Sequence, residues 1–247
     1  MPVPRALLMI GGMSRELIRV LTAEAIGTFA LVFAGCGAIM VDAKTHELGH
    51  VGVALSFGLV IMFGIYAVGH ISGAHFNAAV TFAFALTRNF PWSRAAAYWT
   101  AQLVGAVTAA ALLRASLGNI ADLGTSQPSV AQGQAFLWEL VLSALLMFVI
   151  LAVATDTRAV GEATAIAIGG TIALEAMVGG PISGASMNPT RSLAPALVSG
   201  NLHALCIYIV APFVGVTLGG LAYQFVRGEQ PRPAELQADV AERRKAA

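Results

Sequence analysis

Charge is scarce in this sequence. Charged residues make up 11% of the 247 and hydrophobic residues make up 57%, whereas a soluble domain usually carries roughly a quarter charged residues. So few charges leave too little polar surface to cover a globule in water, which favours the lipid bilayer as the solvent. The net charge of +1 offers no basic excess for neutralising phosphates and therefore argues against a nucleic-acid partner.

Cysteine and the residue patterns of enzyme active sites are also scarce. Two cysteines, Cys36 and Cys206, both lie in apolar runs, so we expect buried thiols rather than a disulfide. We find no Ser/His/Asp constellation, no spacing typical of metal ligands and no phosphate-binding loop. We therefore expect neither an enzyme nor a protein that binds a metal or another cofactor.

Long apolar runs occupy most of the chain. Two shorter apolar segments, at about 76–88 and 188–199, would reach only about halfway through the hydrocarbon, because a helix rises ~1.5 Å per residue. The sequence therefore predicts an all-α membrane protein with six transmembrane helices and two re-entrant half-helices. The six runs that reach the ~20 residues needed to cross a bilayer are 17–41, 50–70, 95–115, 134–154, 160–179 and 203–226.

Positive charges fall on alternating connections between these segments. With both termini in the cytoplasm, eleven of the fourteen Lys and Arg residues lie on the cytoplasmic side, where such residues accumulate. Lys44 and Arg114 lie outside, while Arg191 falls within the second short segment. The expected domains are a cytoplasmic N-terminal segment at 1–16, one channel-like membrane domain at 17–226 and a solvated cytoplasmic tail at 227–247.

The two halves of the chain repeat each other. The stretches that start at Ser72 and Ser183 both read Ser-Gly-Ala and lie 111 positions apart, and Glu24 in the first span corresponds to Glu139 in the fourth. Each half contains three spans, an odd number, so the second copy lies inverted relative to the first. Inverted repeats place the functional site near the midplane where they meet. The repeats occupy about 17–115 and 134–226.

Each short segment begins with a break in the helical pattern at membrane depth. Irregular backbone is tolerated there only where it is buried in protein or lines a water-filled cavity, so we expect both breaks to line one cavity with free carbonyl groups. The backbone expected in its wall belongs to Gly73, Ala74, His75, Phe76, Gly184, Ser186 and Met187.

Asparagine occupies the helix N-cap position in both breaks. The side-chain oxygens of Asn77 and Asn188 can accept from first-turn N–H groups, which leaves each NH2 group free to donate into the cavity. Pro189 suits the first helical position because of its fixed φ. The positive ends of both half-helices then point at the cavity, where they repel cations but not neutral molecules that form hydrogen bonds.

A resemblance to the aquaporin (major intrinsic protein) family rests on Glu24, on Gly69-His-Ile-Ser-Gly-Ala-His-Phe-Asn77 and on Gly184-Ala-Ser-Met-Asn-Pro-Thr-Arg-Ser192. It covers residues 17–226, and the phrase from Gly180 to Leu193 is most similar to the nodulin-26-like branch and to bacterial aquaglyceroporin-like members. The resemblance implies a passive channel in the cell membrane and a homotetramer with one pore per subunit. It also implies that Glu24 and Glu139 brace the two breaks.

The chain departs from the family motif Asn-Pro-Ala. The first copy reads Asn77-Ala78-Ala79 and the second reads Asn188-Pro189-Thr190. Alanine gives up the fixed φ of proline but keeps a strong helix propensity. We therefore expect an intact N-cap in the first copy at a small energetic cost.

The resemblance also implies a narrow selectivity filter near the outer mouth, formed by Phe57, Ala176, Ala185 and Arg191. Water-selective members of the family resemble this ring but carry His at the position of Ala176. With alanine at two of the four positions, we expect a wider and half-apolar ring. Such a ring would admit water, glycerol, urea-like molecules and undissociated metalloid acids. A pore for water alone remains the alternative.

Two further questions stay open at this stage. Glu175 neighbours the filter and could line the outer vestibule, face another polar group or face a neighbouring subunit. A secondary transporter of a small neutral solute is a competing function, because inverted repeats and broken helices occur in that class too. Saturable uptake driven by a gradient would favour the transporter, and linear passive flux would favour the channel.

Overall fold

The computed structural model describes residues 9–10, 13–156 and 163–228. Most of the predicted N-terminal segment and the predicted tail beyond Gly228 lie outside the described residues. A short antiparallel pair, β1 (Met9–Ile10) and β2 (Met13–Ser14), precedes the helices. Ser14 then caps the first helix, since its hydroxyl accepts from the Leu17 N–H at 3.2 Å.

Within the described residues, six helices are long and apolar enough to cross a membrane. Two shorter helices, α3 (Ala78–Leu86) and α7 (Pro189–Ser199), follow the two breaks. The predicted six spans and two half-helices are therefore confirmed. The six long helices are α1 (Arg15–Thr45), α2 (Gly49–Ser72), α4 (Trp92–Leu117), α5 (Gln132–Thr155), α6 (Thr164–Ser183) and α8 (Leu205–Arg227).

The fifth span differs most from its predicted bounds of 160–179. Helix α6 begins at Thr164 and continues through Pro181 to Ser183. A proline within a helix removes one backbone N–H and usually ends or kinks the helix, which is why the prediction stopped early. Here the carbonyl of Met177, which would accept from position 181 in a regular helix, lies 2.7 Å from Nε2 of His50.

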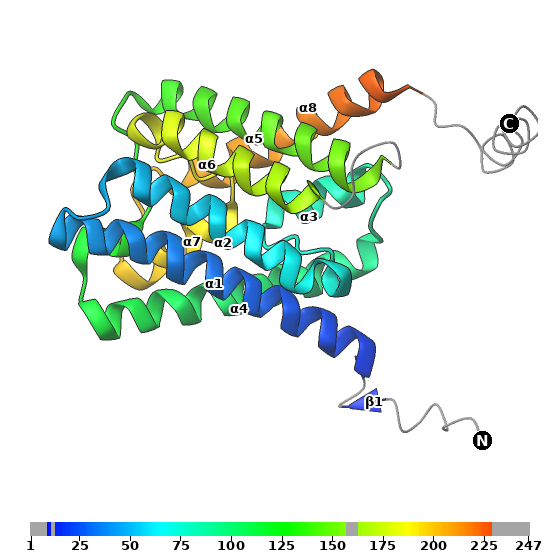
Figure 1. Ribbon diagram of the computed structural model, residues 1–247, viewed down its shortest axis with the longest axis horizontal. Helices are drawn as coiled ribbons and strands as arrows, with labels where there is room; N and C mark the ends of the chain where they lie inside the picture. Colours follow the sequence, from blue (N-terminus) through cyan, green and yellow to red (C-terminus); the bar gives the residue numbers. More distant parts are fainter. Residues whose placement is uncertain (1–8, 11–12, 157–162, 229–247) are drawn as a thin grey trace, which may run out of the picture.

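The helices pack as two similar sets around the centre of the bundle (Figure 1). Helix α1 packs against α4, α5 packs against α8, and α2 packs against α6 between the two sets. A methyl group added at Gly105 would lie 2.0 Å from the Ala25 carbonyl oxygen, and one added at Gly215 would lie 2.3 Å from that of Leu140. These contacts occupy matching positions in the two repeats, so the repeat read from the sequence is present in the packing.

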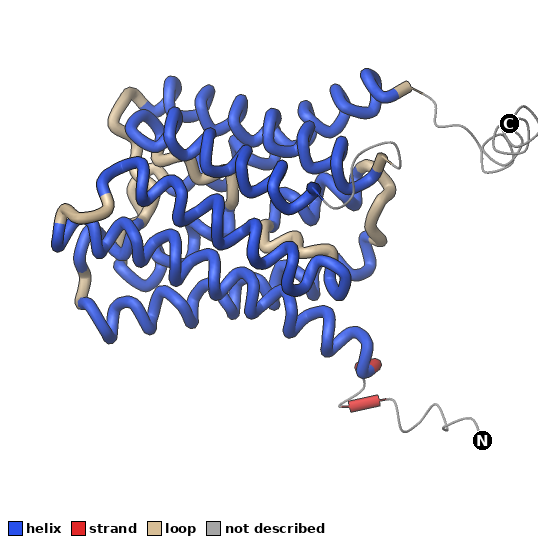
Figure 2. The backbone as a smooth tube through the Cα atoms, viewed as in Figure 1, coloured by secondary structure: helices blue, strands red, loops and turns tan. Residues whose placement is uncertain are grey.

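Each half-helix packs between α4 and α8, so each contacts both repeats. Figure 2 shows loop segments, in tan, inside the helical body as well as at its ends. The first residue of α1 and the last residue of α8 lie at the same end of the bundle (Figure 1). An even number of crossings requires this arrangement.

The outward faces of the long helices are apolar. Phe63, Leu137 and Leu174 are 60–62% exposed on the isolated chain, which suits lipid or another subunit better than water. Both cysteines are free, as expected, but only Cys36 is buried. The prediction of a buried thiol is wrong for Cys206, which lies on the exposed side of α8.

Candidate pore through the helical bundle

The two breaks have nearly the same backbone conformation. In the first, positive φ angles of 86°, 49° and 48° occur at Gly73, Ala74 and Phe76. In the second, the corresponding angles are 90° at Gly184, 41° at Ala185 and 53° at Met187. Left-handed backbone costs a non-glycine residue roughly 1–2 kcal/mol, so other groups must hold the breaks in place. These φ angles match residue by residue across the repeat.

Glu24 holds the first break from α1. Its Oε1 accepts from the Ser72 hydroxyl at 2.7 Å and from the His75 N–H at 3.0 Å, while its Oε2 accepts from the Phe76 N–H at 2.9 Å. Gln102 Nε2 also donates to Oε2, at 2.9 Å, which is the fourth hydrogen bond of this carboxyl group. This fully buried carboxylate thereby satisfies N–H groups that the left-handed backbone withdraws from helical pairing.

Glu139 holds the second break from α5 in the same way. Its Oε1 accepts from the Ser183 hydroxyl at 2.8 Å and the Ser186 N–H at 2.9 Å, and its Oε2 accepts from the Met187 N–H at 2.8 Å. The position that corresponds to Gln102 is Pro212, which has no side-chain donor. Both glutamates thus make the contacts expected of residues that brace the breaks.

The predicted asparagine caps are present in both half-helices. Asn77 Oδ1 accepts from the N–H groups of Ala79 and Val80 at 2.9 and 3.4 Å. Asn188 Oδ1 accepts from the N–H groups of Thr190 and Arg191 at 3.0 and 3.3 Å. The cap of α3 is therefore intact although alanine follows Asn77.

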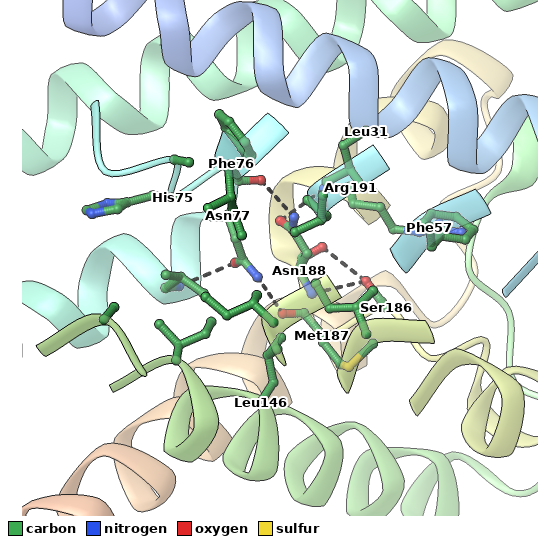
Figure 3. Close-up of a pocket in the computed structure, with 18 of the residues that line it drawn as sticks. Leu31, Phe57, His75, Phe76, Asn77, Leu146, Ser186, Met187, Asn188 and Arg191 are labelled. Atoms are coloured by element: carbon green, nitrogen blue, oxygen red, sulfur yellow. Dashed lines mark hydrogen bonds between the residues drawn. The ribbon is translucent and has the colours of Figure 1, made fainter. Parts of the chain in front are cut away.

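The side-chain amides are not wholly free, and this corrects the prediction. Asn77 Nδ2 donates to the Met187 carbonyl at 2.8 Å, and Asn188 Nδ2 donates to the Phe76 carbonyl at 2.9 Å (Figure 3). The half-helices meet end to end, so the last carbonyl of each break faces the cap of the other, and a buried carbonyl requires a donor. Each amide keeps one N–H for the cavity.

Three carbonyls in each break remain as acceptors. No hydrogen bond within residues 13–156 and 163–228 reaches the carbonyl oxygens of Gly73, Ala74 and His75, or those of Gly184, Ala185 and Ser186. The expected row of free carbonyls is therefore shorter by one residue in each break.

An inner cavity of about 90 Å³ runs along both breaks. Its polar lining comes mainly from the breaks, with Arg191 and Thr164 added by α7 and α6. The remaining lining is apolar and comes from the helices, including Leu31, Ile65, Leu146, Ile150 and Ile168. All but one of the expected lining residues border this cavity, and Gly184 borders a second cavity instead. The residues that border the inner cavity are Gly73, Ala74, His75, Phe76, Asn77, Ser186, Met187 and Asn188.

The motif residues that follow each asparagine lie elsewhere. Ala78, Ala79, Pro189 and Thr190 border neither cavity, because they lie within the first turns of the half-helices. The departure at Ala78 is therefore a matter of helix start rather than of pore lining.

A second cavity of about 400 Å³, the outer cavity, adjoins the first toward the end of the bundle where α1 ends and α2 begins. The two cavities share four lining residues, and these form the neck between them. Figure 3 shows Phe57 and Arg191 beside the paired asparagines. The four shared residues are Phe57, Ala176, Ala185 and Arg191.

Arg191 is buried in this neck with an exposed fraction of 3%. Its Nη1 donates to the Gly124 carbonyl at 2.9 Å and to the Ser126 hydroxyl at 2.7 Å. Its guanidinium carbon lies 4.9 Å from the ring centroid of Phe57, within cation–π range. No carboxylate in the described part of the chain forms an ion pair with Arg191, so the positive charge in the neck is held by neutral acceptors and by the Phe57 ring.

The loop that supports Arg191 was not identified from the sequence. It follows α4 as a short 3-10 turn, η2 (Ile120–Gly124), in which Ala121, Asp122 and Leu123 have φ angles of 46°, 47° and 57°. Asp122 Oδ2 accepts from Gln127 Nε2 at 3.0 Å and from Asn201 Nδ2 at 2.8 Å. The turn-forming residues around 118–124 were the available signal for a structured loop.

Glu175 does not line the outer vestibule, which corrects one of the alternatives. It borders neither cavity, and its exposed fraction is 5%. Neither carboxyl oxygen has a hydrogen-bond partner among the described residues. Its repeat counterpart is Gly64, so nothing equivalent exists in the first half.

Comparisons with known proteins agree with this geometry. The model of the family described as Major intrinsic protein matches residues 13–223. Aquaporin NIP1-1 of Oryza sativa subsp. japonica is 46% identical over 216 residues, which are 87% of this chain and 76% of that protein. Nodulin-26 of Glycine max is also 46% identical over 216 residues, covering 87% and 80%. The X-ray structure of the aquaglyceroporin from Plasmodium falciparum has a TM-score of 0.74 and 27% identity, covering 84% of this chain and 95% of that chain.

Proposed function

The chain belongs to the major intrinsic protein family, a family of channels rather than enzymes, and from that premise we propose that it conducts water and small uncharged solutes passively. Its similarity to the nodulin-26-like proteins confirms the branch indicated by the motifs. The solute range rests on one observation: two of the four residues that line the neck, Ala176 and Ala185, have only a methyl side chain.

The size and polarity of the neck favour small polar solutes beyond water. Two alanines leave space that larger side chains would fill, and Phe57 adds an apolar surface for the carbon skeleton of a polyol. Arg191 and the free carbonyls supply hydrogen bonds to hydroxyl or amide groups. Glycerol, urea-like molecules and undissociated metalloid acids have this combination. A structural relative named as an aquaglyceroporin supports the same range.

Exclusion of cations follows from the charges along the path. Arg191 carries an unpaired positive charge, and the N-terminal ends of α3 and α7 meet at the centre with their positive dipole ends. No aspartate or glutamate borders the inner cavity among the described residues, so no carboxylate in its wall offsets this field. A neutral solute loses little there because it exchanges hydrogen bonds with water for hydrogen bonds with the wall.

Passive flux is favoured over coupled transport by the contacts of Glu24 and Glu139. A coupling carboxylate must be able to bind an ion or a proton on the substrate path. Both glutamates instead accept hydrogen bonds from the breaks and lie outside the cavity wall. This arrangement supports structural roles for them.

We further infer the assembly and the placement in the membrane. The apolar outward faces of the helices support a homotetramer with one pore per subunit in the cell membrane. The distribution of Lys and Arg supports a cytoplasmic N-terminal segment and a cytoplasmic C-terminal tail. These flank a single channel domain at 17–226 in the sequence. Phe57, Ala176, Ala185 and Arg191 act as the filter in this proposal, and Asn77 and Asn188 act as the central barrier to ions.

A panel of solutes tests the proposal on purified protein in liposomes. Stopped-flow light scattering would measure permeability to water, glycerol, urea and boric acid, with protein-free liposomes as the control. We expect all four permeabilities to rise above the control and solute flux to remain linear with concentration. Exclusion of glycerol, urea and boric acid would instead support a pore for water alone, and saturable flux would support a transporter.

A further inference from the structure

His50 lies in the wall of the outer cavity and contacts α6 from α2. Its Nε2 is 2.7 Å from the Met177 carbonyl oxygen, and because a carbonyl can only accept, Nε2 carries the hydrogen. Met177 directly follows the filter residue Ala176, and His50 lies two helical turns outward of the filter residue Phe57. The bond therefore joins the two helices that supply one filter residue each.

The carbonyl of Met177 is available because of Pro181. In a regular α-helix this carbonyl would accept from the N–H of the residue four positions later, but proline has none. Helix α6 nevertheless continues to Ser183. Among the described residues, His50 supplies the missing donor from another helix.

Gly180 provides the space that the imidazole occupies. A methyl group added at Gly180 would lie 2.8 Å from Cε1 of His50, closer than a side chain tolerates. The ring is therefore packed on the backbone of α6 itself. Gly180 and Pro181 together form a site that accepts a flat ring with one N–H donor.

A second fixed point joins the same helices farther inward. A methyl group added at Gly58 would lie 2.4 Å from the Gly169 carbonyl oxygen and 2.6 Å from Cβ of Ala173. This crossing lies eight residues inward of His50, about 12 Å along the helix axis. In each helix the filter residue falls between the two fixed points.

We propose that His50 is a positioning residue of the filter, whose bond to Met177 fixes the separation of α2 and α6 at the outer mouth. It thereby sets the largest solute that can pass between Phe57 and Ala176. This inference rests on the proposed function, since it assumes that these two residues select solutes. Without the bond, the closest backbone contacts between the two helices lie farther inward, around Gly58 and Gly169, and the outer ends can separate.

Variants in liposomes test the proposal through two ratios, the permeability to erythritol relative to glycerol and that to glycerol relative to water. His50→Ala should raise both ratios by about 2- to 12-fold, the factor that corresponds to one net hydrogen bond. His50→Gln should stay near the wild-type ratios, because its amide can still donate to Met177. His203→Ala, an exposed histidine away from both cavities, is the matched control and should change neither ratio.

Pro181→Ala separates positioning from simple pairing of the carbonyl. Alanine at this position restores an N–H within α6, so the Met177 carbonyl no longer needs His50. The double variant His50→Ala/Pro181→Ala should keep the raised ratios of His50→Ala, because the link between the helices is still missing. A return to wild-type ratios would show that His50 merely satisfies the carbonyl and would overturn the proposal.

The same measurements separate a failure of the proposed solute range from a failure of the positioning role of His50. If the wild-type chain excludes glycerol, the proposed solute range fails, yet glycerol flux appearing in His50→Ala would still support the positioning role. If the wild-type chain passes glycerol and His50→Ala leaves both ratios unchanged, the positioning role fails alone. Should His50→Ala not fold, as judged by size-exclusion chromatography, Gly180→Ala must raise the ratios instead, because the added methyl group would lie 2.8 Å from Cε1 of His50 and displace the imidazole; unchanged ratios there would also overturn the proposal.

Discussion

Asn77 and Asn188 each donate to the carbonyl of the residue that precedes the other, at 2.8 and 2.9 Å. Each asparagine also caps its own half-helix through its side-chain oxygen. One side chain thus fixes the start of one helix and holds the break of the other repeat. The centre of the pore is consequently formed by two residues that depend on each other.

Replacing either asparagine by alanine should destabilise the protein by more than the loss of one cap. A cap alone contributes about 1 kcal/mol, and each variant also leaves a buried carbonyl of the other break without its donor. The double variant should show a coupling of about 0.5–3 kcal/mol. Thermal unfolding in detergent would measure this, with Asn119→Ala in an exposed loop as the control. Strict additivity would contradict the reciprocal arrangement.

Ala176→His should narrow the neck and make the channel more selective for water. The imidazole would occupy space in the neck that Phe57 and Arg191 also line, and it would add a polar contact. We expect glycerol permeability to fall at least tenfold while water permeability falls much less; a factor of ten corresponds to about 1.4 kcal/mol. Ala176→Gly is the matched control and should preserve or raise glycerol flux. Equal losses for water and glycerol would show that Ala176 does not select between them.

Ala78→Pro should leave flux and stability nearly unchanged. Ala78 is the first residue of α3, where proline is tolerated because the N–H has no partner in the helix. The preceding Asn77 has φ −153° and ψ 124°, a conformation that a following proline permits. Permeability measured in liposomes should stay within about twofold, and a stability gain should not exceed about 1 kcal/mol. A large gain in flux would show that the natural motif is impaired.

Arg191→Lys should weaken the barrier to cations and relax the filter although the charge is kept. Lysine cannot reproduce the planar contact with Phe57 together with the donation to Gly124 and Ser126. We expect measurable cation conductance in planar bilayers and an increased permeability to larger polyols. Arg114→Lys, whose Nη1 donates to the Val198 carbonyl away from the neck, serves as the control. Unchanged conductance and size selectivity in Arg191→Lys would argue that charge alone suffices.

Glu175→Met should raise thermal stability, whereas Glu139→Met should lower it. Glu175 is buried without a hydrogen-bond partner among the described residues, and an unpaired buried polar group costs about 1–3 kcal/mol. Glu139 accepts three hydrogen bonds from the second break and its flank, so its removal leaves donors unpaired. Melting temperatures in detergent would compare the two variants. A loss of stability in Glu175→Met would reveal a partner for this carboxyl in the assembled protein.

The main features of the fold were available from the sequence because the bilayer imposes them. Span lengths follow from membrane thickness, and the asparagine caps follow from side-chain chemistry at a helix start. The end of α6 was placed too early because proline usually ends a helix, and the donor to the Met177 carbonyl comes from His50, 127 positions away. Local propensity cannot report such a contact.

The residues of the site were predictable from the sequence, but several of their contacts were not. The four residues of the neck came from a family resemblance, and the geometry then placed them together at the boundary of two cavities. The donation between the asparagines and the opposite carbonyls was missed, because it depends on how closely two half-helices approach. The support of Arg191 by Gly124 and Ser126 was missed for the same reason.

The unequal surroundings of the two bracing glutamates show how duplicated halves come to differ in role. The first break has Gln102 as an extra donor to Glu24, whereas Pro212 offers nothing to Glu139. In the second half a chain of hydroxyls runs from Ser186 through Ser192 to Ser126 at 2.5 and 2.8 Å. That chain leads to the loop that holds Arg191. Three of the four neck residues, Ala176, Ala185 and Arg191, also belong to the second half, so substitutions accumulated there should change what this lineage of channels transports more than substitutions in the first half.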